Sequence, residues 1–150
     1  MKIRKAKISD LKPVHKLVNE FAREEKMIAR ALNELYETVR DFVICEDSGT
    51  ICGVCALHIM WEDLAEIRSL AVNKKFQNKG IGRSLVKQCL KEARALGLRR
   101  VFALTYQPEF FKKMGFKDTD KASLPQKIWG DCLRCPKFPE CDENAVMINL

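Results

Sequence analysis

One turn constrains the fold of this chain more than any other feature. Residues 77–83 follow a strand-like apolar run, residues 67–72, and open a long amphipathic helical pattern. Gly80 and Gly82 have no Cβ, so a ligand can approach the backbone closely, and the first helical turn offers its N–H groups to an anion. Lys79 and Arg83 add positive charge. The sequence therefore predicts a strand–turn–helix site for a pyrophosphate-bearing cofactor.

Spacing excludes two familiar phosphate-binding motifs. A Walker loop needs four residues between its first glycine and Gly-Lys-Ser/Thr, and a dinucleotide fingerprint needs three spaced glycines with an acidic residue about 20 positions later. Residues 77–82, Gln-Asn-Lys-Gly-Ile-Gly, fit neither pattern. A different class of phosphate-binding turn is therefore indicated.

Length and composition indicate one small domain. The chain has 150 residues, of which 47% are hydrophobic and 31% charged, so we expect residues 1–150 to form a single domain. Residues 1–10 are basic and lack the apolar segment of a signal peptide. No apolar run approaches the roughly 18 residues that a membrane span needs. We therefore expect a cytoplasmic protein with no membrane partner.

The net charge of +7 is compatible with nucleic-acid binding but does not indicate it. Basic and acidic residues alternate along most of the predicted helices, as they do on solvated faces, and the sequence shows no basic stripe or aromatic platform. We expect no nucleic-acid partner, because an acidic cofactor and an acidic substrate explain the excess charge more simply.

Strand-like and helix-like segments alternate along the chain, which predicts an α/β protein. The expected strands are 3–6, 42–45, 51–60, 64–72, 99–105, 116–119 and 145–149, and the expected helices are one that follows Ser9 and those at 32–39, 80–96 and 109–114. Ser9 is expected to cap the first helix. Helix 80–96 has an apolar face that includes Leu96, and Gly97 is placed to end it.

The glycine turn matches a family signature. Gln77, Gly80 and Gly82 fit the Gln/Arg-x-x-Gly-x-Gly/Ala pattern of the GNAT superfamily of N-acetyltransferases, which the chain resembles from residue 3 to residue 116. The resemblance implies an α/β (α+β) fold, a mixed twisted sheet of about seven strands with helices on both faces, and acetyl-CoA as co-substrate. The residues it assigns to acetyl-CoA are Leu70, Ala71, Val72, Gln77, Asn78, Lys79, Gly80, Ile81, Gly82 and Arg83.

Longer stretches narrow this resemblance. Residues 65–72, 100–106 and 108–111 resemble the acetyltransferase domain of N-acetylglutamate synthases, and much of 124–143 resembles their stand-alone short forms. The resemblance implies acetylation of the α-amine of an amino acid, above all L-glutamate, as the first step of arginine biosynthesis. Two alternatives stay open. One is a GNAT enzyme for another small amine or a protein N-terminus, and the other is a non-catalytic acyl-CoA-binding sensor.

Direct acetyl transfer needs a base, because an α-ammonium group is mostly protonated at neutral pH. The resemblance assigns this role to Glu66, acting through water, and the main-chain N–H of Leu70 is expected to stabilise the oxyanion. Many relatives have a proton-donating tyrosine where this chain has Phe111. Thr105 is therefore the preferred donor to the departing thiolate and Tyr106 the weaker candidate, while solvent is a further alternative.

A glutamate acceptor brings two carboxylates, which a guanidinium group suits. By resemblance, Arg30 aligns with a substrate-binding arginine of the synthases. Arg68, Lys127 and Arg134 are alternative partners, although each is also compatible with a solvated surface position. Dimers are common in the superfamily, so a homodimer is an expected alternative to a monomer.

The seven cysteines do not suggest a disulfide framework, because their number is odd and the chain is expected in the cytoplasm. Cys45, Cys52, Cys55 and Cys89 have the pattern of small core residues. Cys132, Cys135 and Cys141 form a Cys-x2-Cys pair followed by a third cysteine, but a second such pair is absent. Zinc with Asp142, Glu143 or a histidine as fourth ligand stays an alternative, but we favour loop packing or occasional oxidation for these three and assign no metal.

Overall fold

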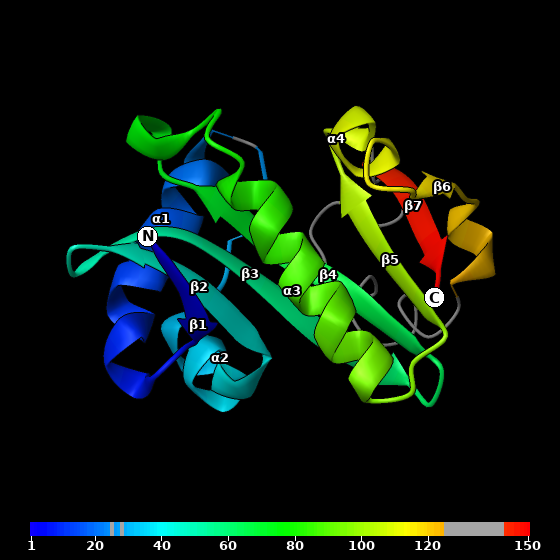
Figure 1. The fold of residues 1–150 in the computed structure, drawn as a ribbon, viewed down its shortest axis with the longest axis horizontal. Coiled ribbons are helices and arrows are strands. Elements are labelled where there is room, and N and C mark those ends of the chain that lie inside the picture. The colour runs from blue at the N-terminus through cyan, green and yellow to red at the C-terminus, as the bar shows by residue number, and fades with distance from the viewer. Residues whose placement is uncertain (25, 28, 125–142) are drawn as a thin grey trace. The chain divides into compact units, whose positions relative to one another are not determined.

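The computed structural model describes residues 1–24, 26–27, 29–124 and 143–150. The chain divides into two compact units, Met1–His58 with Ile67–Glu92 and Ile59–Glu66 with Ala93–Leu150. The strands form one seven-stranded mixed sheet in the order β1-β2-β3-β4-β5-β7-β6 (Figure 1). The predicted α/β class and the predicted sheet are therefore confirmed, whereas the assignment of all 150 residues to one domain stays a prediction.

The first unit holds the N-terminal strands and most of the helices. Its elements are β1 (Lys2–Lys5), α1 (Leu11–Arg23), α2 (Leu32–Glu37), β2 (Phe42–Asp47), most of β3 (Thr50–Trp61) and β4 (Leu64–Val72), and α3 (Ile81–Ala95) as far as Glu92, with 3-10 turns at Ile8–Asp10, Val39–Asp41 and Lys74–Phe76. β1, β2 and β3 pair antiparallel in chain order.

Helices cover both faces of the sheet in the first unit. α1 and α2 share a buried apolar cluster with β2 and β3 that includes Val54. The neighbouring residue, Gly53, faces the other way, and a Cβ there would lie 3.0 Å from both Ile81 Cγ2 and Leu85 Cδ1 of α3. α3 therefore runs across β3 on the opposite face, as Figure 1 shows, and glycine allows it to lie close to the strand.

The second unit is built around β5. Its elements are the end of β3, the start of β4, the last turn of α3, β5 (Arg100–Thr105), α4 (Pro108–Lys112), β6 (Lys117–Asp118), a 3-10 turn at Lys121–Ser123 and β7 (Asn144–Asn149). β5 runs parallel to β4 and antiparallel to β7 (Figure 1). Leu64, Phe102, Leu124 and Ala145 form one buried apolar cluster of this unit.

Most predicted elements are present with ends shifted by one or two residues, and β4 has the predicted bounds. The expected cap at Ser9 is wrong. A 3-10 turn precedes α1, which begins at Leu11, and the nearby carboxylate of Asp10 accepts the Lys7 N–H at 2.6 Å. The spacing of apolar residues predicted the helix correctly, but it did not predict the 3-10 turn before it.

The burial expected for Leu96 is also wrong, since this side chain is 56% exposed. α3 ends at Ala95, and Gly97 adopts a φ of 85°. The N–H of Leu98 then donates to the Ala93 carbonyl at 3.0 Å, which closes the helix in the manner of a glycine C-cap. The predicted end of the helix at Gly97 is thus confirmed, whereas Leu96 faces away from the core.

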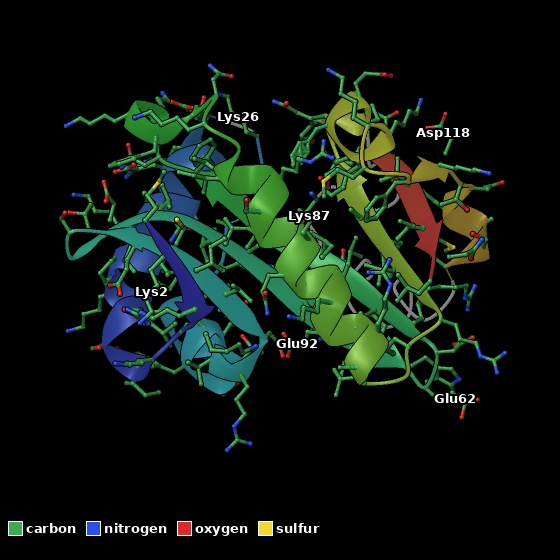
Figure 2. The ribbon with its side chains drawn as sticks, in the orientation of Figure 1. Lys2, Lys26, Glu62, Lys87, Glu92 and Asp118 are labelled. Atoms are coloured by element: carbon green, nitrogen blue, oxygen red, sulfur yellow. The ribbon has the colours of Figure 1, made fainter. Side chains whose placement is uncertain are left out.

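Charged side chains lie on the surface of each unit. Lys2 and Lys26 of the first unit and Glu62 and Asp118 of the second are exposed (Figure 2). In the part of the chain that the structure describes, none of the helices combines the length and apolarity needed to cross a membrane.

Candidate functional site

β4 changes conformation in its second half. Ser69 has a φ of 53°, which is rare for a residue with a Cβ and falls within a nine-residue strand. Such backbone strain persists only where the surroundings hold it, and it is common at ligand sites. Ser69 lies immediately before Leu70, Ala71 and Val72, three of the residues predicted to contact acetyl-CoA. Sequence reasoning missed Ser69, because a serine within a strand pattern carries no signal of a positive φ.

The segment after β4 forms the predicted turn. Asn73 follows Val72, and its side-chain oxygen accepts the Lys75 N–H at 3.0 Å, which caps the 3-10 turn. The Nε2 atom of Gln77 then donates to the Val72 carbonyl oxygen at 3.0 Å. The loop is thus closed back onto the end of the strand from which it left.

Two residues in the left-handed region lead the chain into α3. Asn78 has a φ of 64° and Gly80 a φ of 81°. A Cβ at Gly80 would meet nothing within 4 Å, so glycine is needed there for its backbone conformation and leaves the approach open. The Ser84 N–H donates to the Gly80 carbonyl at 3.1 Å, so the N–H groups of residues 81–83 precede the first bond of the helix.

The chemistry of this turn fits a pyrophosphate. Residues 77–80 and Arg83 are exposed, and the Nζ atom of Lys79 lies 5.5 Å from the centroid of the Phe76 ring. The helix dipole and the N–H groups of the first turn favour an anion, and the two cations add to the attraction. Most of the predicted acetyl-CoA residues of the turn are therefore accessible, whereas Gly82 is half-buried and the side chain of Ile81 is buried.

Glu66 belongs to the second unit and is only 4% exposed. It is paired with Phe102 across the parallel β4–β5 ladder, and strand alternation places it on the same face as Leu64. β4 has a hydrogen-bonded neighbour on each side in the sheet. Glu66 is therefore a buried acid on an inner strand and not a solvated surface residue.

The two candidate proton donors follow each other at the end of β5. The Oγ1 atom of Thr105 accepts the Gln107 N–H at 2.8 Å, and the same hydroxyl can donate its own proton. Tyr106 is half-buried. Phe111 is buried and makes an edge-to-face contact with Phe116, with ring centroids 5.1 Å apart, so this residue packs α4 into the core.

Arg30 lies between α1 and α2 in the first unit. Its N–H donates to Asn19 Oδ1 at 3.2 Å, and its carbonyl accepts from Asn19 Nδ2 at 3.3 Å. The guanidinium Nη1 is 4.0 Å from Glu34 Oε2, and the side chain is 21% exposed. Arg68 is half-buried on β4. Sequence reasoning missed Asn19, because one asparagine on a helix does not indicate a distant partner.

The remaining predicted residues divide into two groups. Lys127, Arg134, Cys132, Cys135 and Cys141 lie outside the described residues. The other four cysteines, Cys45, Cys52, Cys55 and Cys89, are free and buried in the first unit, as predicted. Among residues 1–124 and 143–150, apart from 25 and 28, no group of His, Cys, Asp and Glu has the arrangement of a metal site.

Sequence comparison places these features in a known context. Residues 11–116 match the model of the acetyltransferase (GNAT) family. An uncharacterized N-acetyltransferase of Chlorobaculum tepidum is 40% identical over 148 residues, which cover 99% of this chain and 96% of that protein. An amino-acid acetyltransferase of Mycobacterium tuberculosis is 35% identical over 135 residues, which cover 88% of this chain and 77% of that protein.

Solved structures agree with the sequence comparison. A Mycobacterium tuberculosis protein in complex with CoA and a ligand designated NLQ has a TM-score of 0.87 and 29% identity over 100% of this chain and 99% of that chain. N-acetylglutamate synthase from Neisseria gonorrhoeae, complexed with coenzyme A and N-acetyl-glutamate, has a TM-score of 0.90 and 26% identity. That match covers 99% of this chain but 35% of the synthase chain.

Proposed function

Because the chain belongs to the acetyltransferase (GNAT) family and uses acetyl-CoA as its co-substrate, we propose that it acetylates the α-amine of an amino acid, above all L-glutamate. The observation that carries the acceptor class is the 35% identity, over 88% of the chain, to a protein named amino-acid acetyltransferase. The structural likeness to a synthase complexed with N-acetyl-glutamate supports glutamate within that class. The proposal assigns the protein to the first step of arginine biosynthesis in the cytoplasm.

The turn after β4 binds the pyrophosphate of acetyl-CoA in this proposal. The N–H groups of residues 81–83 donate to phosphate oxygens, and Lys79 and Arg83 balance the charge. Main-chain groups of Leu70, Ala71 and Val72 hold the pantetheine arm. The positive φ of Ser69, 53°, supports this role, since it turns the backbone of β4 just before these three residues.

Acetyl-CoA supplies an activated acetyl group as a thioester. Glu66 accepts a proton from the α-ammonium through a water molecule, which leaves the amine a lone pair for the new C–N bond. The N–H of Leu70 stabilises negative charge on the acetyl oxygen. The C–S bond breaks, the nitrogen loses its second proton to solvent as the amide forms, and the thiolate takes a proton from Thr105 or from solvent. The burial of Glu66, at 4% exposure, supports a role other than surface solvation.

Arg30 binds a carboxylate of the acceptor in this proposal. Its side chain is partly buried, at 21% exposure, and the guanidinium lies 4.0 Å from a carboxylate oxygen of Glu34. A planar guanidinium donates two parallel hydrogen bonds to one carboxylate, which a lysine cannot do with the same geometry. Arg68, on β4, is the second candidate among the described residues.

The test measures release of free CoA thiol from acetyl-CoA with glutamate, glutamine, aspartate, spermidine and a short peptide. We expect selective turnover with glutamate. Glu66→Gln should lower kcat by about 10²-fold or more, as loss of a general base does, and leave acetyl-CoA affinity unchanged. The control is Glu62→Gln, the same change at an exposed position of the same unit.

The other outcomes separate the alternatives. Turnover with a different amine would keep the acetyltransferase but remove glutamate as its acceptor. Tight binding of acetyl-CoA without turnover of any amine in the panel would overturn the enzymatic proposal and favour an acyl-CoA-binding sensor. Full activity of Glu66→Gln would remove Glu66 from the mechanism while leaving the acceptor assignment in place.

A further inference from the structure

The side chain of Asn19 ties α1 to the residue that leads into α2. Its Oδ1 atom accepts the Arg30 N–H at 3.2 Å, and its Nδ2 atom donates to the Arg30 carbonyl at 3.3 Å. Both polar groups of the side chain thus pair with both main-chain groups of a single residue. Two hydrogen bonds of opposite direction fix the position and direction of the backbone at Arg30.

α2 depends on this contact because it has little local support. The helix has six residues, which is too short for stability by itself, and its N-cap, Ala31, makes no side-chain capping bond. Leu35 anchors the helix in the buried cluster that α1 also enters. Arg30 directly precedes Ala31, so the pairing with Asn19 holds the backbone next to the N-cap of α2.

The segment between α1 and α2 is held at its other end as well. Glu24, just after α1, forms ion pairs with Lys26 at 3.0 Å and with Lys74 in the 3-10 turn after β4. Arg30 then lies at the second fixed point, with its guanidinium 4.0 Å from Glu34 Oε2 on α2. Asn19 thus fixes the backbone from which the Arg30 side chain extends, while Glu34 lies near its guanidinium.

We propose that Asn19 is a positioning residue for acceptor recognition, which it serves by holding the backbone of Arg30. The inference rests on the proposed function, in which Arg30 binds an acceptor carboxylate. A carboxylate clamp needs its donors within a fraction of an ångström of their places, and an arginine on an unanchored backbone loses that precision. Loss of the Asn19 side chain should therefore raise the KM for the acceptor, because both of its hydrogen bonds are made with Arg30.

The experiment compares Asn19→Ala with Asn33→Ala, the same change at an exposed position on α2. We expect Asn19→Ala to raise the KM for glutamate about tenfold, equivalent to about 1.4 kcal/mol of binding free energy. kcat and the KM for acetyl-CoA should stay within about twofold of wild type, and Asn33→Ala should match wild type in all three. Hydrogen exchange at the Arg30 amide, which loses its acceptor, should become faster in Asn19→Ala alone.

A double variant gives the decisive comparison. In the Arg30→Ala background, Asn19→Ala should raise the KM for glutamate no further, because Arg30→Ala already removes the guanidinium that Asn19 positions against the acceptor carboxylate. Three results would overturn the inference: additive rises in KM for the two changes, an unchanged KM in Asn19→Ala, or a fall in kcat and thermal stability without a change in KM. In each case, turnover of glutamate by the wild-type protein would leave the proposed function standing. Absence of that turnover would overturn the proposed function alone. The inference would then depend on hydrogen exchange at the Arg30 amide and on the KM for whichever amine is acetylated. Unchanged hydrogen exchange in Asn19→Ala would overturn it.

Discussion

The side-chain amide of Gln77 donates a 3.0 Å hydrogen bond to the main-chain carbonyl of Val72. The bond joins the first residue of the glycine signature to the last residue of β4. A carbonyl oxygen has two lone pairs, so Val72 can accept this bond and a further one from a ligand. Gln77 thus has a structural reason to stand at the start of the signature, because it holds the loop that carries Asn78, Lys79 and Gly80.

Removal of this bond should weaken acetyl-CoA binding without affecting the acceptor. In Gln77→Ala we expect the KM for acetyl-CoA to rise about three- to tenfold, since one neutral hydrogen bond contributes about 1 kcal/mol and the loop loses its brace. Calorimetric titration with CoA checks the same loss at equilibrium. Gln88→Ala, at an exposed position on α3, is the matched control. Equal affinities in the two variants would contradict the role assigned to Gln77.

The strongest local signals in the sequence predicted the corresponding structure well. The apolar run of β4 forms a strand with the predicted bounds, Leu64–Val72. The glycine turn after it leads into an accessible helix N-terminus, as predicted. Gly97 ends α3 in the left-handed conformation, with a φ of 85°, because local chemistry alone favours that stop. Features of this kind depend on a few neighbouring residues, so they can be predicted from the local sequence.

Features that depend on distant contacts were not predictable. Asn19 and Arg30 are 11 positions apart, and no spacing rule links a helix residue to the backbone of a later loop. The glycine at position 53 supports the close approach of α3, which begins at Ile81. The left-handed Ser69 is imposed by its surroundings, since serine has no intrinsic preference for that region. Tertiary structure selects these states, and the local sequence does not.

Thr105 should supply the proton to the thiolate through its hydroxyl. Thr105→Val keeps the shape of the side chain and removes the hydroxyl, and we expect kcat to fall about ten- to a hundredfold as for loss of a general acid. Thr105→Ser should keep most activity. Because Oγ1 also accepts the Gln107 N–H at 2.8 Å, a thermal unfolding curve is needed to measure the structural part of the effect. A loss of kcat in Tyr106→Phe with none in Thr105→Val would reverse the assignment.

The buried thiols should resist alkylation in the folded protein. Burial, together with the neighbouring Cys45 thiol, raises the pKa of Cys52 to about 12. A hydrogen bond with Cys89, whose Sγ lies 3.7 Å away, and burial both raise the pKa of the Cys55 thiol. Only the thiolate reacts, so little of either residue is reactive at pH 8. Iodoacetamide labelling followed by peptide mass spectrometry should show these cysteines modified only after denaturation, and rapid labelling of Cys52 in the native protein would contradict this.

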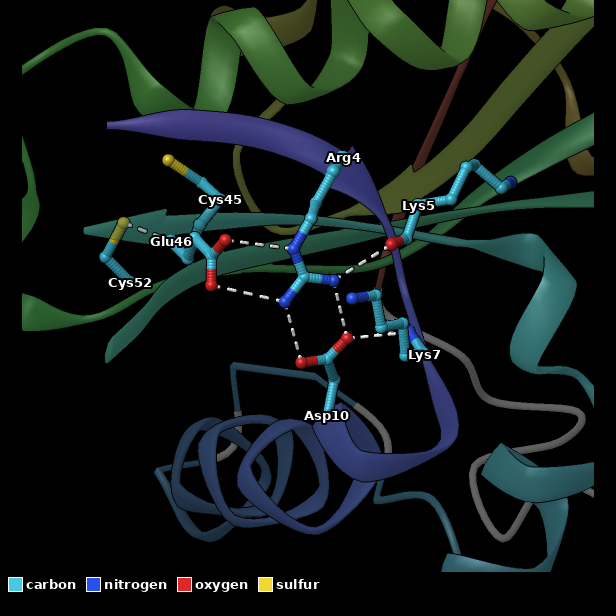
Figure 3. Close-up of polar contacts among 7 residues, drawn as sticks. All are labelled: Arg4, Lys5, Lys7, Asp10, Cys45, Glu46 and Cys52. Carbon is cyan, nitrogen blue, oxygen red and sulfur yellow. Dashed lines mark hydrogen bonds and ion pairs between the residues drawn. The ribbon is translucent and has the colours of Figure 1, made fainter. Parts of the chain in front are cut away.

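Acid should destabilise the protein through the contacts of Arg4, which Figure 3 shows. The guanidinium Nη1 and Nη2 atoms lie 2.8 and 3.0 Å from the two Asp10 carboxylate oxygens, and Nε lies 3.0 Å from Glu46 Oε1. Hydrogen bonds from Arg4 hold the pKa of both carboxyls below their ordinary values, although partial burial of Asp10 opposes the effect. The network joins β1, the turn before α1 and β2.

The direction of the pH effect follows from these lowered pKa values. A carboxyl whose pKa is lower in the folded state binds fewer protons there than in the unfolded state, so its stabilising effect is present above the ordinary pKa of about 4 and is lost as the pH falls below it. Asp10→Asn should be less stable at pH 7 by about 1–3 kcal/mol, because it leaves part of the Arg4 guanidinium unpaired. It should also lose less stability than wild type between pH 5 and pH 3. Urea unfolding across that range checks both, with Glu37→Gln at an exposed site as the control. A decline in Asp10→Asn parallel to that of wild type would show that the acid sensitivity comes from other groups.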